Sequence, residues 1–115
     1  MFDINEKRRS SRVGLRIPLQ YKEVDGSDAR TQGTLTVDMS ENGARFTTDK
    51  FIPLERHMLI ETTLPSNSSL IKALSKVAWI RKMPYCDEYE VGIRFVSISK
   101  QDRENLSDSA KRFRV

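Results

Sequence analysis

The sequence predicts a mainly β domain, a small antiparallel barrel or sandwich of six strands followed by one C-terminal α-helix. Apolar and polar residues alternate in six short stretches that turn-forming residues separate, and near residue 99 the apolar spacing changes to that of a helix. At 115 residues the chain has the length of one ordinary domain. A domain of this size buries roughly 60 to 70% of the surface that its unfolded chain exposes, so it can hold a hydrophobic core of its own.

Alternation is clearest in the first predicted strand, where Leu15, Ile17, Leu19 and Tyr21 fall on one face. This period of two is typical of a half-buried strand. The same pattern predicts five more strands, near residues 31–37, 44–48, 57–64, 70–82 and 89–96. Turn-forming residues lie between them, in the segments 25–27, 65–69 and 83–88.

The predicted helix begins after Ser99. Residues 99–102 resemble a capping box, with Asp102 in the place of the usual Glu or Gln. Leu106, Ala110 and Phe113 then recur at helical spacing, which predicts an amphipathic helix over about residues 99–113. Basic residues near its end complement the helix dipole, so their charge needs no nucleic acid partner.

Positive charge is concentrated at the N-terminus. Residues 1–22 contain six of the 20 basic and two of the 16 acidic side chains, so the net charge of +4 lies in this segment. A basic segment on an otherwise neutral domain attracts an anion to one place, although it could also be a solvated tail. We therefore expect two parts: a flexible basic N-terminal arm, residues 1–12, and the β domain with its helix, residues 13–115.

Several classes of function find no support in the sequence. Cys86 is the only cysteine and His57 the only histidine, so we expect no disulfide, no metal cluster and no nucleophile–base pair. The acidic residues Asp87, Glu88 and Glu90 are expected to form a solvated cluster in a hairpin turn. No stretch has the length and apolarity of a signal or a membrane span. We expect a cytoplasmic protein that is not an enzyme and needs no cofactor.

Two polar motifs carry the functional argument. Residues 8–12 have the sequence RRSSR, an Arg-x-x-x-Arg pattern that this composition produces about once by chance. Residues 12–16 repeat the pattern. Residues 38–43 have the sequence DMSENG, whose Asp-x-Ser-x-x-Gly pattern has a chance expectation of roughly 0.05. The second motif is therefore the more specific one, although an Asx-type turn ended by glycine has the same sequence.

In this order the two motifs resemble the PilZ family of cyclic di-GMP receptors, over nearly the whole chain. The arginine motif leads into the first strand, and the Asp-x-Ser-x-x-Gly turn follows one hairpin later. Residues 77–81 (VAWIR) and 91–95 (VGIRF) are similar to later strands of the family. The resemblance implies a six-stranded antiparallel, split β-barrel with a C-terminal helix, and a stand-alone member of the family.

The resemblance also implies which residues bind the ligand. Cyclic di-GMP carries two phosphodiester charges and two guanines, and an Arg fork can meet a phosphate, pair with guanine O6 and N7, or stack on a base. Arg8 and Arg12 would bind phosphate and guanine, with Arg9 as an auxiliary contact. Lys7 precedes the motif, where the family's residue influences whether one ligand or a stacked pair binds, so the stoichiometry stays open.

The second motif would contribute the guanine contacts. Asp38 is an acceptor that complements the N–H donors of guanine, and Ser40 adds a hydroxyl. Gly43 is expected to allow a positive φ or a close approach of backbone and ligand. Trp79 lies where the family often has an aromatic residue near the ligand. Because Trp79 shares a strand face with Val77, we expect packing in the core in preference to stacking on a base.

We expect a cyclic di-GMP receptor that orders its N-terminal arm on the ligand and regulates an unidentified effector protein in trans. One alternative is a PilZ-like protein-interaction scaffold that works without ligand. Another is a nucleic-acid-binding β-barrel, which the confinement of the basic excess to the arm disfavours.

The arginine register can be tested by substitution. Arg8→Ala and Arg12→Ala are each expected to weaken cyclic di-GMP binding by about 2 to 5 kcal/mol, the usual loss when one partner of a buried charged contact is removed. Arg16→Ala should have a milder effect, because only the first motif matches the family's placement. Calorimetric titration of the three variants measures this, and a largest loss at Arg16→Ala would show that the register is wrong.

Overall fold

The computed structural model describes residues 16–24, 30–65 and 68–112. Within them the chain forms six strands and a helix, as the sequence predicts. Their bounds are β1 Pro18–Glu23, β2 Gln32–Met39, β3 Gly43–Thr48, β4 His57–Thr63, β5 Leu70–Lys82, β6 Tyr89–Ile98 and α1 Lys100–Arg112. The expected arm, residues 1–12, and the expected hairpin turn at residues 25–27 lie outside the described residues.

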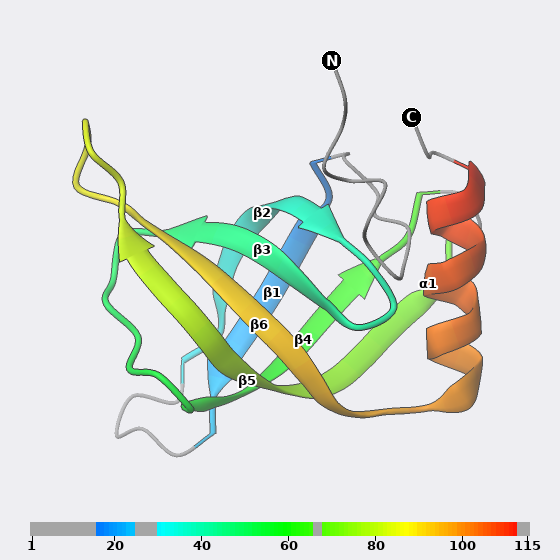
Figure 1. The fold of residues 1–115 in the computed structure, drawn as a ribbon. Coiled ribbons are helices and arrows are strands. Elements are labelled where there is room, and N and C mark those ends of the chain that lie inside the picture. Colours follow the sequence, from blue (N-terminus) through cyan, green and yellow to red (C-terminus); the bar gives the residue numbers. More distant parts are fainter. Residues whose placement is uncertain (1–15, 25–29, 66–67, 113–115) are drawn as a thin grey trace.

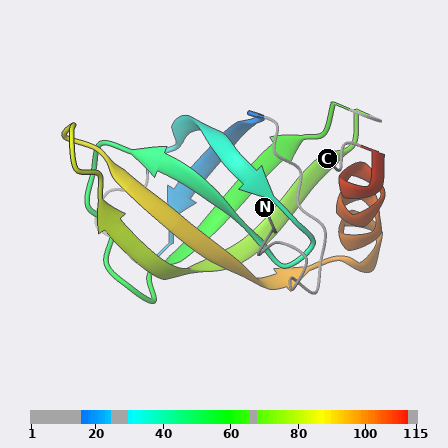
Figure 2. The ribbon, with the colours of Figure 1, turned by 45° about the horizontal axis from the view of Figure 1, so that its top comes forward.

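The six strands close into an antiparallel barrel, which decides between the barrel and the sandwich (Figure 1). The order around the barrel is β1-β2-β3-β6-β5-β4, and every neighbouring pair is antiparallel. Pairing of β1 with β4, where Leu19 lies opposite Thr62, closes the circle. The hairpin between β5 and β6 extends from one end of the barrel and α1 covers the other (Figures 1 and 2).

The barrel interior follows from the alternation. Leu19 and Tyr21 of β1, and Ala44 and Phe46 of β3, point inward and are buried. The rings of Tyr21 and Phe46 pack with their centroids 4.9 Å apart. Burial raises the pKa of the Tyr21 phenol, whose hydroxyl forms a 2.8 Å hydrogen bond with the hydroxyl of Thr48. The polar end of Tyr21 is thereby satisfied inside the core.

Irregularities in the strands decide which side chains leave the core. The register between β5 and β6 shifts between Val77 and Trp79, where an extra residue on β5 breaks the period of two. Val77 is fully buried, whereas Trp79 is 38% exposed. The expectation that Trp79 packs in the core with Val77 is therefore wrong, because the bulge turns the indole to the outside of the barrel.

Helix α1 begins as the sequence predicts. The backbone N–H of Asp102 donates to Ser99 Oγ at 3.0 Å, which is one half of the expected capping box. The Asp102 carboxylate accepts a hydrogen bond from the backbone N–H of Lys72 on β5, at 3.3 Å. Leu106 is buried in the barrel core. The start of α1 is thus attached to the sheet by a polar contact and an apolar one.

Candidate functional site

The Asp-x-Ser-x-x-Gly motif forms the turn between β2 and β3. The backbone N–H of Ser40 donates to the carbonyl oxygen of Gly43 at 2.8 Å, and the N–H of Asn42 donates to Ser40 Oγ at 3.2 Å. The Ser40 side chain is buried. Its hydroxyl therefore stabilises the turn from within, as hydroxyls of Ser and Thr do in turns.

Two other elements hold this turn from outside. The backbone N–H of Phe95 on β6 donates to the carbonyl oxygen of Asn42 at 2.9 Å. Arg103 of α1 donates from Nη1 to the carbonyl oxygen of Glu41, also at 2.9 Å. The motif turn is therefore fixed by the barrel and by the C-terminal helix together.

One of the two reasons expected for Gly43, a positive φ, is wrong. No glycine among the described residues has a positive φ, so left-handed backbone is not the constraint. A Cβ atom at Gly43 would lie 2.0 Å from the carbonyl oxygen of Ile93. The close approach is thus between β3 and the backbone of β6, and a side chain at this position would force the two strands apart.

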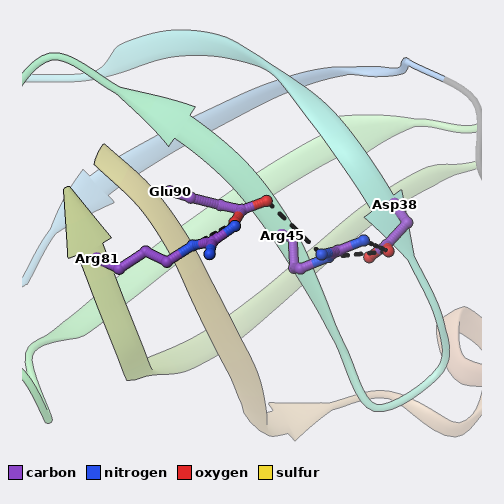
Figure 3. Close-up of polar contacts among 4 residues, drawn as sticks. All are labelled: Asp38, Arg45, Arg81 and Glu90. Carbon is purple, nitrogen blue, oxygen red and sulfur yellow. Dashed lines mark hydrogen bonds and ion pairs between the residues drawn. The ribbon is translucent and has the colours of Figure 1, made fainter. Parts of the chain in front are cut away.

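Asp38 is buried beside the turn and pairs with Arg45 of β3 (Figure 3). The Asp38 side chain is 8% exposed, and its Oδ2 accepts hydrogen bonds from both Nε and Nη2 of Arg45, the first at 2.9 Å. This hydrogen bond raises the pKa of Arg45 above its ordinary value. The carboxylate and the guanidinium form a charge-assisted pair, which fixes both side chains.

A second buried carboxylate extends this pair into a row of charges. Glu90 of β6 is 8% exposed, and its Oε2 lies 3.6 Å from Arg45 Nη1. Its Oε1 accepts from Arg81 Nε and Nη2 at 3.0 and 2.7 Å. The expectation of a solvated cluster is wrong for Glu90, which belongs to a strand and faces two guanidiniums (Figure 3). We call Asp38, Arg45, Glu90 and Arg81 the charge row.

The sequence contains a signal for Arg45 outside the two motifs. Asp38 lies two residues before Ser40, and Arg45 lies two residues after Gly43. A hairpin closed by this turn places them opposite each other, and the structure pairs them. Cross-strand pairs of opposite charge are a common source of stability in antiparallel sheets. Arg81 and Glu90 carry a similar signal, because they lie opposite each other across the hairpin of β5 and β6. The link between Glu90 and Arg45 had none, since the two residues are far apart in the sequence.

A cleft of about 390 Å³ lies on the outer face of β3, β6 and β5. Arg45 on β3 pairs with Gly92 on β6, and Gly92 pairs with Trp79 on β5. A Cβ atom at Gly92 would lie 2.2 Å from Cε2 and Nε1 of Trp79, so the indole lies directly over this glycine. The cleft is lined by Asn42, Gly43, Ala44, Arg45, Ala78, Trp79, Gly92, Ile93 and Arg94.

The structure brings together four of the predicted site residues. Asp38, Ser40 and Gly43 come together at the turn, and Trp79 lies in the cleft that Gly43 also lines. The basic residues Lys7, Arg8, Arg9 and Arg12 lie outside the described residues. Over the described part of the chain, no cluster of His, Cys, Asp and Glu could hold a metal ion. No described helix is long and apolar enough to cross a membrane.

The point where the chain enters the barrel is close to the turn. The backbone N–H of Ile17 donates to Thr36 Oγ1 at 3.0 Å, and the N–H of Thr36 donates to the carbonyl oxygen of Ile17 at 2.9 Å. Thr36 precedes Asp38 by two residues on β2. Ile17 is therefore bonded to β2 two residues before the motif carboxylate.

The chain is a small β-barrel domain: a closed barrel of six strands with a C-terminal helix and a cleft beside the β2–β3 turn. Comparison with known proteins identifies its family. The PilZ domain family matches residues 6–111, and the chain belongs to this family, which is a family of cyclic di-GMP receptors. The comparison with curated protein sequences finds no match.

Solved structures share the fold at low sequence identity. The inhibitor of motility MotI/DgrA of Bacillus subtilis matches with a TM-score of 0.79 and 15% identity, over 92% of this chain and 50% of that one. The chain thus spans half the length of the Bacillus protein. The PilZ domain of YcgR from Escherichia coli, solved with cyclic di-GMP, matches with a TM-score of 0.69 and 16% identity, over 92% of each chain. The PilZ domain of CeSA from a cellulose-synthesizing bacterium matches with a TM-score of 0.59 and 17% identity, over 90% of this chain and 93% of that one.

The close approach at Gly43 predicts a contrast between two glycines of the same hairpin. Gly43→Ala should destabilise the protein by about 1 to 3 kcal/mol, because the new methyl meets backbone that cannot move without cost. Gly33→Ala is the matched control, since a Cβ there has nothing within 4 Å, and it should stay within about 0.5 kcal/mol of the parent. Thermal or urea unfolding measures both, and equal stability of the two variants would contradict this account of Gly43.

Proposed function

We propose that this PilZ domain binds cyclic di-GMP in the cleft beside the motif turn and acts as a receptor. The observation that carries the proposal is the pairing of residues across four successive strands of the barrel. Asp38 pairs with Arg45, Arg45 with Gly92, and Gly92 with Trp79. The cleft is lined by the indole of Trp79 and the guanidinium of Arg45, and Arg45 is hydrogen-bonded to the buried carboxylate of Asp38. Guanine needs these groups: a surface on which to stack, and an acceptor for its N–H donors.

The proposed ligand contacts divide between the barrel and the arm. Trp79 would stack on a base, and Asp38 would accept from the N1–H and N2–H donors of guanine. Ser40 and Gly43 would act by holding the turn, since the hydroxyl of Ser40 is buried and Gly43 packs on β6. Arg94 lines the same cleft and adds positive charge for an anionic ligand.

The arm would supply the phosphate contacts. Arg12 is five residues from Ile17 and Arg8 is nine, and an extended chain spans up to roughly 3.5 Å per residue. We propose that this length of chain lets both arginines contact a ligand in the cleft. Arg9 and Lys7 would be auxiliary contacts of the same kind.

We further propose that the bound arm is the output of the receptor. A basic arm that folds over an anionic ligand turns a small-molecule signal into a new protein surface. The partner would be an effector protein regulated in trans, and the domain itself would have no catalytic activity. The Escherichia coli PilZ domain with cyclic di-GMP supports the choice of ligand, although at 16% identity its likeness to this chain is one of fold.

A PilZ scaffold that works without ligand is the second candidate, and one observation favours it. Asp38 and Ser40 each have a structural partner within the domain, Arg45 and the turn. Residues with such roles persist in a scaffold after ligand binding is lost. The two candidates differ in whether cyclic di-GMP binds at all.

Ligand preference tests the proposal. Cyclic di-GMP should bind more tightly than cyclic di-AMP or GMP, because adenine lacks the donors that Asp38 accepts and GMP lacks the second phosphodiester and base. Calorimetric titration with the three nucleotides reports affinity and stoichiometry together. Similar heats with all three, or no heat with cyclic di-GMP, would favour the scaffold.

The proposed stacking contact can be tested separately. Trp79→Ala should weaken cyclic di-GMP binding to the folded protein by about 1 to 3 kcal/mol, the usual value of one base–aromatic stack. Tyr85→Ala is the matched control, since Tyr85 is 97% exposed on the hairpin between β5 and β6. Equal affinities of the two variants would place the base elsewhere.

A further inference from the structure

The hydrogen bonds from Arg45 to Asp38 suggest that Arg45 does more than link two strands. Two N–H groups of Arg45, Nε and Nη2, donate to the same oxygen of Asp38, Oδ2, and this fixes the orientation of the carboxylate. We propose that Arg45 is a positioning residue for guanine specificity, which orients the Asp38 carboxylate toward the donors of the base. The inference rests on the proposed function and adds a residue outside both motifs.

The need for such a residue follows from the freedom of a carboxylate. The terminal torsion of Asp is broad, so an unheld carboxylate rotates and presents its oxygens in many directions. A planar guanidinium that donates through two N–H groups removes this freedom. Discrimination by hydrogen bonds depends on such preorganised geometry, because a misplaced acceptor does not penalise the base that lacks a donor.

The rest of the charge row holds Arg45 in turn. Glu90 Oε2 lies 3.6 Å from Arg45 Nη1, and Glu90 itself accepts two hydrogen bonds from Arg81. The four side chains come from β2, β3, β6 and β5, so each is anchored to a different strand of a closed sheet (Figure 3). The orientation of Asp38 is thus determined by the barrel.

The charge row also balances the charges of its two buried carboxylates. Asp38 on β2 and Glu90 on β6 are both 8% exposed, and two buried carboxylates that flank the same strand, β3, repel each other. Arg45 lies between them and neutralises both, while Arg81 balances the second charge. The row therefore keeps an anionic acceptor beside the cleft without a net buried charge, at the usual cost of desolvating the pair.

Direct contact of Arg45 with the ligand is the competing explanation, because Arg45 is 34% exposed and lines the cleft. The two roles predict different results. A direct contact to phosphate or a stack on a base would add affinity for any purine dinucleotide of the same shape. A positioning role changes the ratio of affinities between bases that differ in the donors offered to Asp38.

The experiment compares cyclic di-GMP with cyclic di-IMP, whose hypoxanthine lacks the 2-amino donor. The parent protein should prefer cyclic di-GMP by roughly tenfold or more, the usual value of a hydrogen bond to a charged group. In Arg45→Met the preference should fall to about threefold or less. Glu90→Gln, which loosens Arg45 without touching Asp38, should give an intermediate ratio. Arg45→Lys keeps the charge but loses the fork, and should also fall below the parent.

Arg56→Met is the matched control. Arg56 forms a partly buried ion pair with Glu23 at 2.8 Å, outside the residues that line the cleft, and its loss should leave the preference unchanged. Arg45→Lys also provides the measurement if Arg45→Met does not fold. If the parent binds cyclic di-GMP and all Arg45 variants keep its preference, or lose affinity for both nucleotides equally, the positioning role is overturned and the proposed function stands. If the parent does not bind cyclic di-GMP, both are overturned.

Discussion

The pairing of β3 with β6 is the constraint on which the candidate site depends. It brings Gly43 so close to the backbone at Ile93 that a single methyl would not fit. The same register places Arg45 beside Gly92 and lets the amide of Phe95 hold the motif turn. Since Gly92 in turn pairs with Trp79, one strand alignment positions the turn, the guanidinium and the indole.

The charge row combines two buried carboxylates with two guanidiniums that are still partly exposed. Two carboxylates and two guanidiniums alternate, so no charge is left without an opposite neighbour. Pairs of this kind contribute little to stability compared with apolar packing, and removing one partner costs far more than the pair contributes. A row of charges beside a cleft is therefore easier to explain by recognition than by stability.

Much of the fold could be predicted from the sequence. Alternation located all six strands within a few residues, and Ser99 marked the start of the helix. The direction of Trp79 could not be predicted, because a bulge is set by the pairing of two strands and leaves no signal in one of them. Glu90 was expected in a solvated acidic cluster, although the predicted strand 89–96 contains it. Its burial depends on pairing with Arg81 and Arg45 from the strands on either side of β6.

The site was predicted in part. The motif turn forms as expected, but the reason for Gly43 is the backbone of β6, which lies fifty residues further along the chain and cannot be inferred from the motif. Arg45 was not among the predicted site residues, because it belongs to neither motif. The contribution of the arginine motif stays a prediction, since those residues lie outside the described part of the chain.

A titration of isotope-labelled protein with cyclic di-GMP, followed by nuclear magnetic resonance, tests the central claim most directly. The account predicts the largest shifts at the indole N–H of Trp79 and the amides of Asn42, Gly43 and Gly92, with contacts between base protons and the indole ring. The amide of Tyr85 at the tip of the β5–β6 hairpin should not move. Base contacts that cluster on another face, with the Trp79 and Gly92 signals unchanged, would contradict the assignment of this cleft as the nucleotide site.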